Sequence, residues 1–571
     1  MLMNLIDNDL RTPFEKGNGN QSTTYQECIS YYEKLDGLYN EAKLTTYGTT
    51  SIGKPLHLMI LSRDKIFDPV QIRKTNKRIL LINNGIHPGE PDGIDASMMF
   101  ARDILVKKDL QSLLDHVVII IIPVYNVSGM LNRGSSSRAN QNGPEEYGFR
   151  GTAQNYDLNR DFVKCDSREA QTFTQIFQEW KPEIFIDTHV SDGADYQYTM
   201  TLISTQPDKL NPTLSAYQEK VLLPDLNAAM KDAGYEVTPY VNPINTTPDS
   251  GIVAFLETPR FSTGYAALFN CIGMMPETHM LKPYKARVFS TYHLLMEVTR
   301  IINRDYLQVG ENKESADLKV SQQKEFALQW NLDENNFSLI PFKGFTAEYR
   351  PSEVSGQPRL YYNKSLPYEQ QVKYFNHYTA SEIIEKPFGY IVPQAWEQVI
   401  RRLTLNGVQM VPLSKDTFIK AQVYYIDTFN TSKEAYEGHY IHSKVTVHSE
   451  EQTFPFFQGD YLIPLDQPAN RYIVEMLEPQ GVDSYFAWNF FDPILMEKEY
   501  FSDYVWEEKA AELLKENASL KNIFENKKIQ DISFAKDQEA QLYFIYTHST
   551  NYEKSYRRYP VVRIIDESGL K

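Results

Sequence analysis

The chain has 571 residues, a length that predicts two domains and allows three. Its formal net charge of −16, from 58 basic and 74 acidic residues, argues against a nucleic acid or an anionic membrane as a partner, because both require clustered Lys and Arg. The longest apolar run, residues 117–122, is far shorter than the roughly 20 residues of a membrane helix, so it predicts a buried strand in a soluble protein without a membrane span.

Predicted strands and helices alternate through the first half of the chain. In order, the sequence predicts a helix at 24–39, paired strands within 44–59, a strand at 78–83, a helix at 95–106, a strand at 117–123, a long loop at 133–155, a strand at 183–189, a helix at 224–233, a strand ending near 277 and a helix at 287–302. The segment 78–123 reads as a β-α-β unit, provided that its two strands are parallel. It predicts an α/β domain with functional loops at the carboxyl ends of the strands.

The pattern changes near residue 305, where short alternating runs between turn residues begin to recur and favour β structure. The elements expected there are strands near 337–342, 421–426 and 441–447, a helix at 505–525, and late strands at 540–546 and 561–565. We therefore expect two units, one α/β domain in residues 1–305 and one β-rich (α+β) accessory module of unknown role in residues 306–571.

A histidine and a glutamate follow the predicted strand at 78–83, in the sequence His87-Pro-Gly-Glu90. An imidazole and a carboxylate together at a strand end suit a zinc ion. The spacing alone is weak evidence, because a chain with 11 His and 74 acidic residues contains it about once by chance. A catalytic zinc takes three protein ligands and leaves a fourth position for water. His189, at the polar end of the strand at 183–189, is the third ligand that we expect.

Two further motifs accompany these ligands, Asp157-Leu-Asn-Arg160 and, after an apolar stretch, Glu277. The ordered series resembles the zinc carboxypeptidase family, the carboxypeptidase A/B-like metallopeptidases, over roughly residues 20–300. The loop at 123–129 is similar to that family's Asn-Pro-Asp-Gly loop, although it lacks the Pro and the Asp. The resemblance implies a three-layer α/β/α domain with a mixed central sheet, and one zinc ion per chain at His87, Glu90 and His189.

The resemblance also implies roles around the metal. Glu277 is the implied general base, and Asn159 with Arg160 receives the substrate's free C-terminal carboxylate, which a guanidinium fork binds well. Arg150, ahead of Arg138, is the implied ligand of the oxyanion. Tyr265 is an implied substrate contact, although it lies only 12 residues before Glu277, closer than the mobile tyrosine of the best-known members.

Other interpretations of the same residues stay open from the sequence. They are a solvated loop pair for His87 and Glu90, a core histidine bonded to Asp187 for His189, and an ion pair with Asp157 or Asp161 for Arg160. Because side chains alternate along a strand, His279 shares a face with Glu277 and is an alternative ligand.

The sequence thus predicts a zinc metallocarboxypeptidase that acts on a peptide or peptide-like substrate with a free C-terminal carboxylate. The alternatives are a related zinc amidohydrolase acting on an acyl-amino acid or a cell-wall peptide, and an inactive binding or scaffold protein that keeps the fold. The compartment is open. Met1–Asp7 shows neither a basic start nor an apolar core of secretory length, Cys28, Cys165 and Cys271 form no paired motif, and the resemblance implies export as one option.

Overall fold

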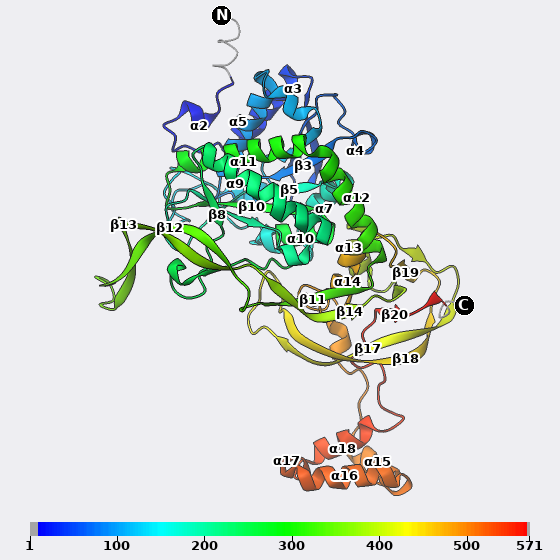
Figure 1. Ribbon diagram of the computed structural model, residues 1–571. Coiled ribbons are helices and arrows are strands. Elements are labelled where there is room, and N and C mark those ends of the chain that lie inside the picture. The colour runs from blue at the N-terminus through cyan, green and yellow to red at the C-terminus, as the bar shows by residue number, and fades with distance from the viewer. Residues whose placement is uncertain (1–9, 568–571) are drawn as a thin grey trace, which may run out of the picture.

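In the computed structural model, which describes residues 10–567, a nine-stranded mixed sheet organises the first half of the chain (Figure 1). Its order is β1-β2-β4-β3-β5-β10-β7-β8, and β6 pairs with β10. The strands are β1 (Ala42–Thr49), β2 (Pro55–Leu61), β3 (Arg78–Asn83), β4 (Val117–Ile122), β5 (Ile184–Asp187), β6 (His189–Ser191), β7 (Met200–Ser204), β8 (Val237–Pro239) and β10 (Ile272–His279). The segment Met1–Asp7, where we expected no export signal, lies outside the described residues.

The centre of this sheet is parallel, because β3 pairs in parallel with both β4 and β5, and β5 pairs in parallel with β10. Every residue of β3, β4 and β5 is buried. Strands that are covered on both faces read as continuous apolar runs, which is why the sequence located them. The parallel pairing of β3 and β4 confirms the predicted β-α-β unit, with helix α5 as its crossover.

Helices cover both faces of the sheet: α5 packs against α11 on one side, and α7 and α10 lie on the other (Figure 1). The helices are α2 (Pro13–Lys16), α3 (Tyr25–Leu38), α4 (Pro69–Ile72), α5 (Asp92–Val106), α6 (Val127–Leu131), α7 (Arg168–Trp180), α8 (Pro212–Tyr217), α9 (Leu223–Asp232), α10 (Ser262–Leu268) and α11 (Tyr284–Arg304). The expected three-layer α/β/α arrangement with a mixed central sheet is confirmed.

The second half of the chain combines β-sheets with helices, as the α+β expectation states. It begins at α12 (Tyr306–Gln322), directly after α11 ends. Its strands are β11 (Glu325–Leu332), β12 (Ser338–Pro351), β13 (Pro358–Phe375), β14 (Tyr378–Glu385), β15 (Gly389–Val392), β16 (Val411–Pro412), β17 (Thr417–Thr431), β18 (His442–Phe456), β19 (Tyr461–Pro464) and β20 (Val562–Ile564), and its inner helices are α13 (Glu397–Leu405) and α14 (Asn470–Leu477). Six of these strands form one sheet, in the order β16-β19-β15-β20-β17-β18. The long hairpin of β12 and β13 pairs with β9 (Ile252–Val253) of the first half.

A small helical unit lies apart from these sheets, at the end of the molecule away from α3 (Figure 1). It consists of α15 (Asp503–Glu516), α16 (Ala518–Gln530), α17 (Ile532–Ala535) and α18 (Gln538–Thr547). The single helix expected at 505–525 is therefore two helices, because Asn517 caps the start of α16. The strand expected at 540–546 was wrong: the run lies in α18, which Asp537 caps and whose apolar residues pack into the core of the unit.

Among residues 10–567, none of the helices combines the length and the apolar character that crossing a membrane requires. Cys28, Cys165 and Cys271 are buried free thiols.

Candidate metal centre and substrate pocket

The turn after β3 places His87 and Glu90 at the carboxyl edge of the sheet. The amide of Glu90 donates to the carbonyl of His87 at 2.8 Å, which folds the two side chains toward each other. Between them, Gly89 leaves room for the side chain of Arg138, since a Cβ at this position would lie 2.7 Å from its Cδ atom. The sequence His-Pro-Gly-Glu thus builds a tight bend that an arginine covers.

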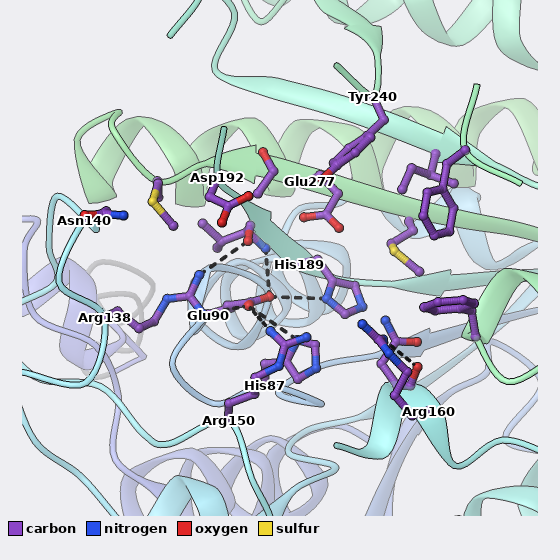
Figure 2. A pocket seen from close by; sticks show the side chains of 18 of the residues that line it. His87, Glu90, Arg138, Asn140, Arg150, Arg160, His189, Asp192, Tyr240 and Glu277 are labelled. Carbon is purple, nitrogen blue, oxygen red and sulfur yellow. Dashed lines mark hydrogen bonds and ion pairs between the residues drawn. The ribbon is translucent and has the colours of Figure 1, made fainter. Parts of the chain in front are cut away.

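His189, the first residue of β6, approaches Glu90 from the neighbouring strand (Figure 2). Its Nδ1 atom lies 3.2 Å from Oε2 of Glu90, and Nδ1 of His87 lies 3.3 Å from Oε1 of the same carboxylate. One ligand atom from each of the three residues falls within 4.8 Å of the others. Two donors about 2.1 Å from a tetrahedral zinc are about 3.4 Å apart, so the spacing fits a zinc ion.

A carboxylate holds the far nitrogen of each imidazole. Nε2 of His87 lies 2.8 Å from Asp157, and Nε2 of His189 lies 2.9 Å from Asp187. These contacts favour a proton on each Nε2 and turn each Nδ1 atom toward Glu90, the orientation found in the carboxylate–histidine–metal arrangement of zinc sites. Within residues 10–567, Nδ1 of His87 is buried without a hydrogen-bond partner, which is the property expected of a metal ligand. The donor set therefore fits zinc.

Charge is concentrated at this edge. Burial alone would raise the pKa of Glu90, but Arg138 and His87 hold it well below its usual range. Burial would lower the pKa of His189, yet the carboxylates of Asp187 and Glu90 raise it well above its ordinary value. Glu90 thus stays an anion ready to bind a cation.

Glu277, in β10, pairs in register with His189 in β6 and faces the same pocket (Figure 2). Burial raises the pKa of the Glu277 carboxyl to about 8, although the neighbouring His189 opposes the shift. A carboxylate with a raised pKa is a stronger base and is suited to take and return a proton near neutral pH.

Two arginines border the candidate metal ligands. Arg138 donates to Oε1 of Glu90 at 2.8 Å, and Arg150 lies 3.4 Å from the same atom. Arg150 also donates to Asp157 through its Nε atom at 2.9 Å. Both arginines line the pocket, and Arg138, which we ranked second, lies closer to Glu90 than Arg150 does.

Asn159 and Arg160 reach the pocket from the short 3₁₀ turn η2 (Leu158–Arg160). Asp157 caps this turn by accepting from the amide of Asn159, so one carboxylate fixes both His87 and the turn. The guanidinium of Arg160 stacks over the ring of Phe261, 4.5 Å from its centroid. Its ion pair with Asp157 is long, at 3.9 Å, and its Nη1 atom donates to the carbonyl of Asn159 at 2.9 Å.

The pocket has a volume of about 440 Å³ and two unlike walls. The polar wall carries the ligands and arginines together with Asn140 and Asp192 (Figure 2). We call the large apolar lining residues Ile203, Tyr240, Phe255, Phe261 and Met275 the apolar wall, and its Phe261 contacts Arg160. The sequence interpretation missed this second wall, because Tyr240, Phe255 and Phe261 lie in loops with neither periodicity nor a motif to mark them.

The structure contradicts the expected role of Tyr265 and rules out His279 as an alternative metal ligand. Tyr265 does not reach the pocket: it is fully buried in α10 among the aromatic rings of the core, and its hydroxyl donates to Asn406 at 2.7 Å. Its helix turns it away from the site, so we withdraw it as a substrate contact. His279 does not reach the metal ligands, because its Nε2 contacts the carbonyl of Ala194 at 2.8 Å and its Nδ1 accepts from the amide of Leu281.

Comparison with known proteins agrees with this arrangement. The family described as "Zinc carboxypeptidase" matches residues 28–219, which include the three candidate ligands but not Glu277. "Carboxypeptidase 2" of Trichophyton equinum is 18% identical over 456 residues, covering 76% of this chain and 78% of the relative. "Carboxypeptidase 2" of Trichophyton rubrum is 19% identical over 454 residues, with the same coverage.

A metallo-carboxypeptidase from Burkholderia cenocepacia, known from a crystal structure, aligns with a TM-score of 0.38 at 15% sequence identity, over 50% of this chain and 70% of that one. The match over residues 28–219 identifies a zinc carboxypeptidase domain, a hydrolase of the metallopeptidase class, in the first half of the chain.

Proposed function

We propose that the protein is a zinc-dependent carboxypeptidase that hydrolyses the last peptide bond of a substrate with a free C-terminal carboxylate. The proposal is supported by one observation: a His-Glu-His group that could hold a metal, the buried Glu277 and the side chain of Arg160 line one pocket. His87, Glu90 and His189 would hold the zinc. When bound there, zinc would polarise the scissile carbonyl and acidify water.

Glu277 supplies the proton transfer. It accepts a proton from the attacking water and returns it to the leaving amine, for which its raised pKa of about 8 is suited. Arg150 steadies the negative charge that develops on the carbonyl oxygen, with Arg138 on the same wall as its alternative.

Arg160 binds the terminal carboxylate of the substrate through paired charged hydrogen bonds, with Asn159 beside it. The side chain of the last residue then enters the space bounded by Ile203, Phe255 and Met275. Because this wall carries neither a carboxylate nor an ammonium group, we expect large apolar C-terminal residues to be preferred over charged ones.

Matched peptides with free and amidated C-termini test the proposal. The wild-type protein should hold one zinc ion by metal analysis and cleave the free peptide much faster than the amidated one. Glu277→Gln should keep the metal and lower kcat by about 10²- to 10⁴-fold. Arg160→Ala should raise KM for the free peptide and leave cleavage of the amidated one unchanged, because only the former presents a carboxylate.

Each contrary result selects an alternative. Equal cleavage of both peptides, or equal effects of Arg160→Ala on both, points to an amidohydrolase that does not read the C-terminus. Protein that binds no zinc points to a scaffold. Full activity in Glu277→Gln removes Glu277 as the base.

A further inference from the structure

A turn from the second half of the chain reaches the segment that orients the metal ligands. The loop between β17 and β18 folds at Tyr436–His439, where the backbone N–H groups of Tyr436 and His439 each donate to the other's carbonyl, at 2.7 and 3.0 Å. Glu437 and Gly438 both have positive φ, 50° and 84°, as in the tight turns of hairpins. Glu437 thus occupies a backbone conformation that favours glycine, although its side chain makes a contact with a distant segment.

The carboxylate of Glu437 contacts the backbone of the metal site. Its Oε2 atom accepts from the amide of Asp157 at 2.8 Å, across 280 residues of sequence. Asp157 is the residue whose own carboxylate holds Nε2 of His87 and caps the turn that carries Arg160. One side chain of the second half therefore supports the residue that orients both a metal ligand and the proposed carboxylate receptor.

Neighbouring contacts fix this turn in place. A Cβ on Gly438 would lie 3.2 Å from the ring of Tyr156, so the turn packs directly on the residue before Asp157. Nε2 of His439 lies 2.8 Å from Asp166, which also pairs with Arg402 of α13 at 2.8 Å. The two residues that follow Glu437 therefore anchor the turn.

A second anchor supports the apolar wall of the pocket. Asp483 accepts from the amide of Arg260 at 2.9 Å and from its Nε atom at 2.7 Å. The guanidinium of Arg260 stacks on Trp488, 4.8 Å from the ring. The next residue, Phe261, lines the pocket and carries the stacked guanidinium of Arg160.

We propose that the second half of the chain is a working part of the active site, with Glu437 and Asp483 as positioning residues. Glu437 acts through Asp157 on His87, and Asp483 acts through Phe261 on the binding of the substrate's last residue. The inference rests on the proposed carboxypeptidase function but makes separate predictions for metal affinity and for substrate binding.

The first test measures zinc affinity of the full chain by competition with a chelator. Glu437→Ala leaves the Asp157 amide without its acceptor, and affinity should fall roughly tenfold, the low end for groups that support metal ligands. Glu437→Gln keeps an acceptor oxygen and should stay within about twofold of wild type. Glu434→Ala, at an exposed position of the same loop, is the matched control and should be unchanged.

The second test separates KM from kcat on a peptide with a free C-terminus. Asp483→Ala should raise KM roughly tenfold with little change in kcat. The change loosens the apolar wall that receives the substrate and leaves the reacting groups in place. Asp483→Asn keeps one acceptor and should show a smaller rise. Thermal unfolding of each variant identifies those that lose the fold. Where an Ala variant is unfolded, the folded Glu437→Gln or Asp483→Asn variant is used to test that position.

The outcomes are distinguishable from failure of the proposed function. If the wild type binds zinc but cleaves no peptide, the function fails while the zinc measurement still tests Glu437. If the wild type is active and both Glu437→Ala and Asp483→Ala match the Glu434→Ala control, the inference is overturned and the function stands. Equal losses in Glu437→Ala and Glu437→Gln also overturn the role of the acceptor oxygen.

Discussion

Different kinds of contact hold the metal-site edge of the sheet and the helical unit of α15–α18. At the candidate metal site, His87, Glu90 and His189 are at most 4% exposed, and charged partners surround them. The helical unit instead packs around Trp506, Phe524 and other apolar side chains, which form a core of its own. Its surface carries single exposed apolar residues such as Tyr504, at 84%.

The comparison shows how far a local change should spread. Buried ion pairs join segments that are distant in sequence, so removing one partner leaves an unpaired charge and disturbs several segments at once. An apolar cluster within four consecutive helices involves only its own neighbours. Changes at the first site should therefore affect metal binding and overall stability together, whereas changes in the helical unit should remain local.

The largest expected effect is at Lys164, whose side chain is fully buried and pairs with Asp161 at 2.7 Å and Asp166 at 3.0 Å. Lys164→Met leaves these carboxylates without their shared cation and should lower the free energy of unfolding by about 3–5 kcal/mol. The exposed Lys420, 2.8 Å from Glu451, is the matched control, and Lys420→Ala should cost about 0–1 kcal/mol. Urea unfolding measures both, and equal costs would contradict the comparison.

In the helical unit, Trp506→Ala should cost about 3 kcal/mol by leaving a cavity in a small core. Trp506 is 4% exposed and its indole donates to the carbonyl of Leu542 at 3.1 Å. Amide hydrogen exchange should speed up across α15–α18, while zinc affinity stays unchanged. Tyr504→Ala on the same helix should alter exchange little. A loss of zinc affinity in Trp506→Ala would show that the unit is coupled to the metal site.

Topology explains what the sequence could predict. Strands buried on both faces are continuous apolar runs, and parallel strands bring their carboxyl ends to one edge, so the positions of His87 and His189 followed from β3 and β5. The run at 540–546 was ambiguous, because short apolar runs suit a buried strand or a buried helix equally. Tyr265 was an implied substrate contact although its spacing differs from that of the best-known members, and the sequence does not reveal which way its helix turns the side chain.

Contacts between distant segments could not be predicted. Glu437 and Asp483 meet their partners across 280 and 223 residues, and nothing in their local sequence marks them. The choice between Arg138 and Arg150 likewise depends on how one long loop folds back over Gly89. Such contacts arise from packing between elements, which periodicity within one element does not encode.

A smaller effect is expected at Asp187, which accepts from Asn83 through Oδ1 and holds Nε2 of His189 through Oδ2. Asp187→Asn places an amide donor against one of these two donors, so His189 loses its fixed orientation. Zinc affinity should fall about 10- to 100-fold, which corresponds to about 1.4–2.7 kcal/mol. Asp192→Asn, on the pocket wall, is the control and should retain the affinity. Equal affinities in the two variants would remove Asp187 as the orienting group.

The smallest effect concerns pH and the buried His279 beside the pocket. Burial lowers its pKa to about 4, whereas an unfolded histidine titrates near 6.5. Below pH 6.5 the unfolded chain takes up a proton that the folded protein excludes until pH 4, so this residue's contribution to stability is lost as the pH falls. Between pH 7 and pH 5, the titration of His279 should lower the free energy of unfolding by roughly 1–2 kcal/mol. His279→Gln keeps a donor for the carbonyl of Ala194 but does not titrate, so its stability should fall less steeply than that of the wild type over this range. Parallel stability curves would show that folding does not lower the pKa of His279.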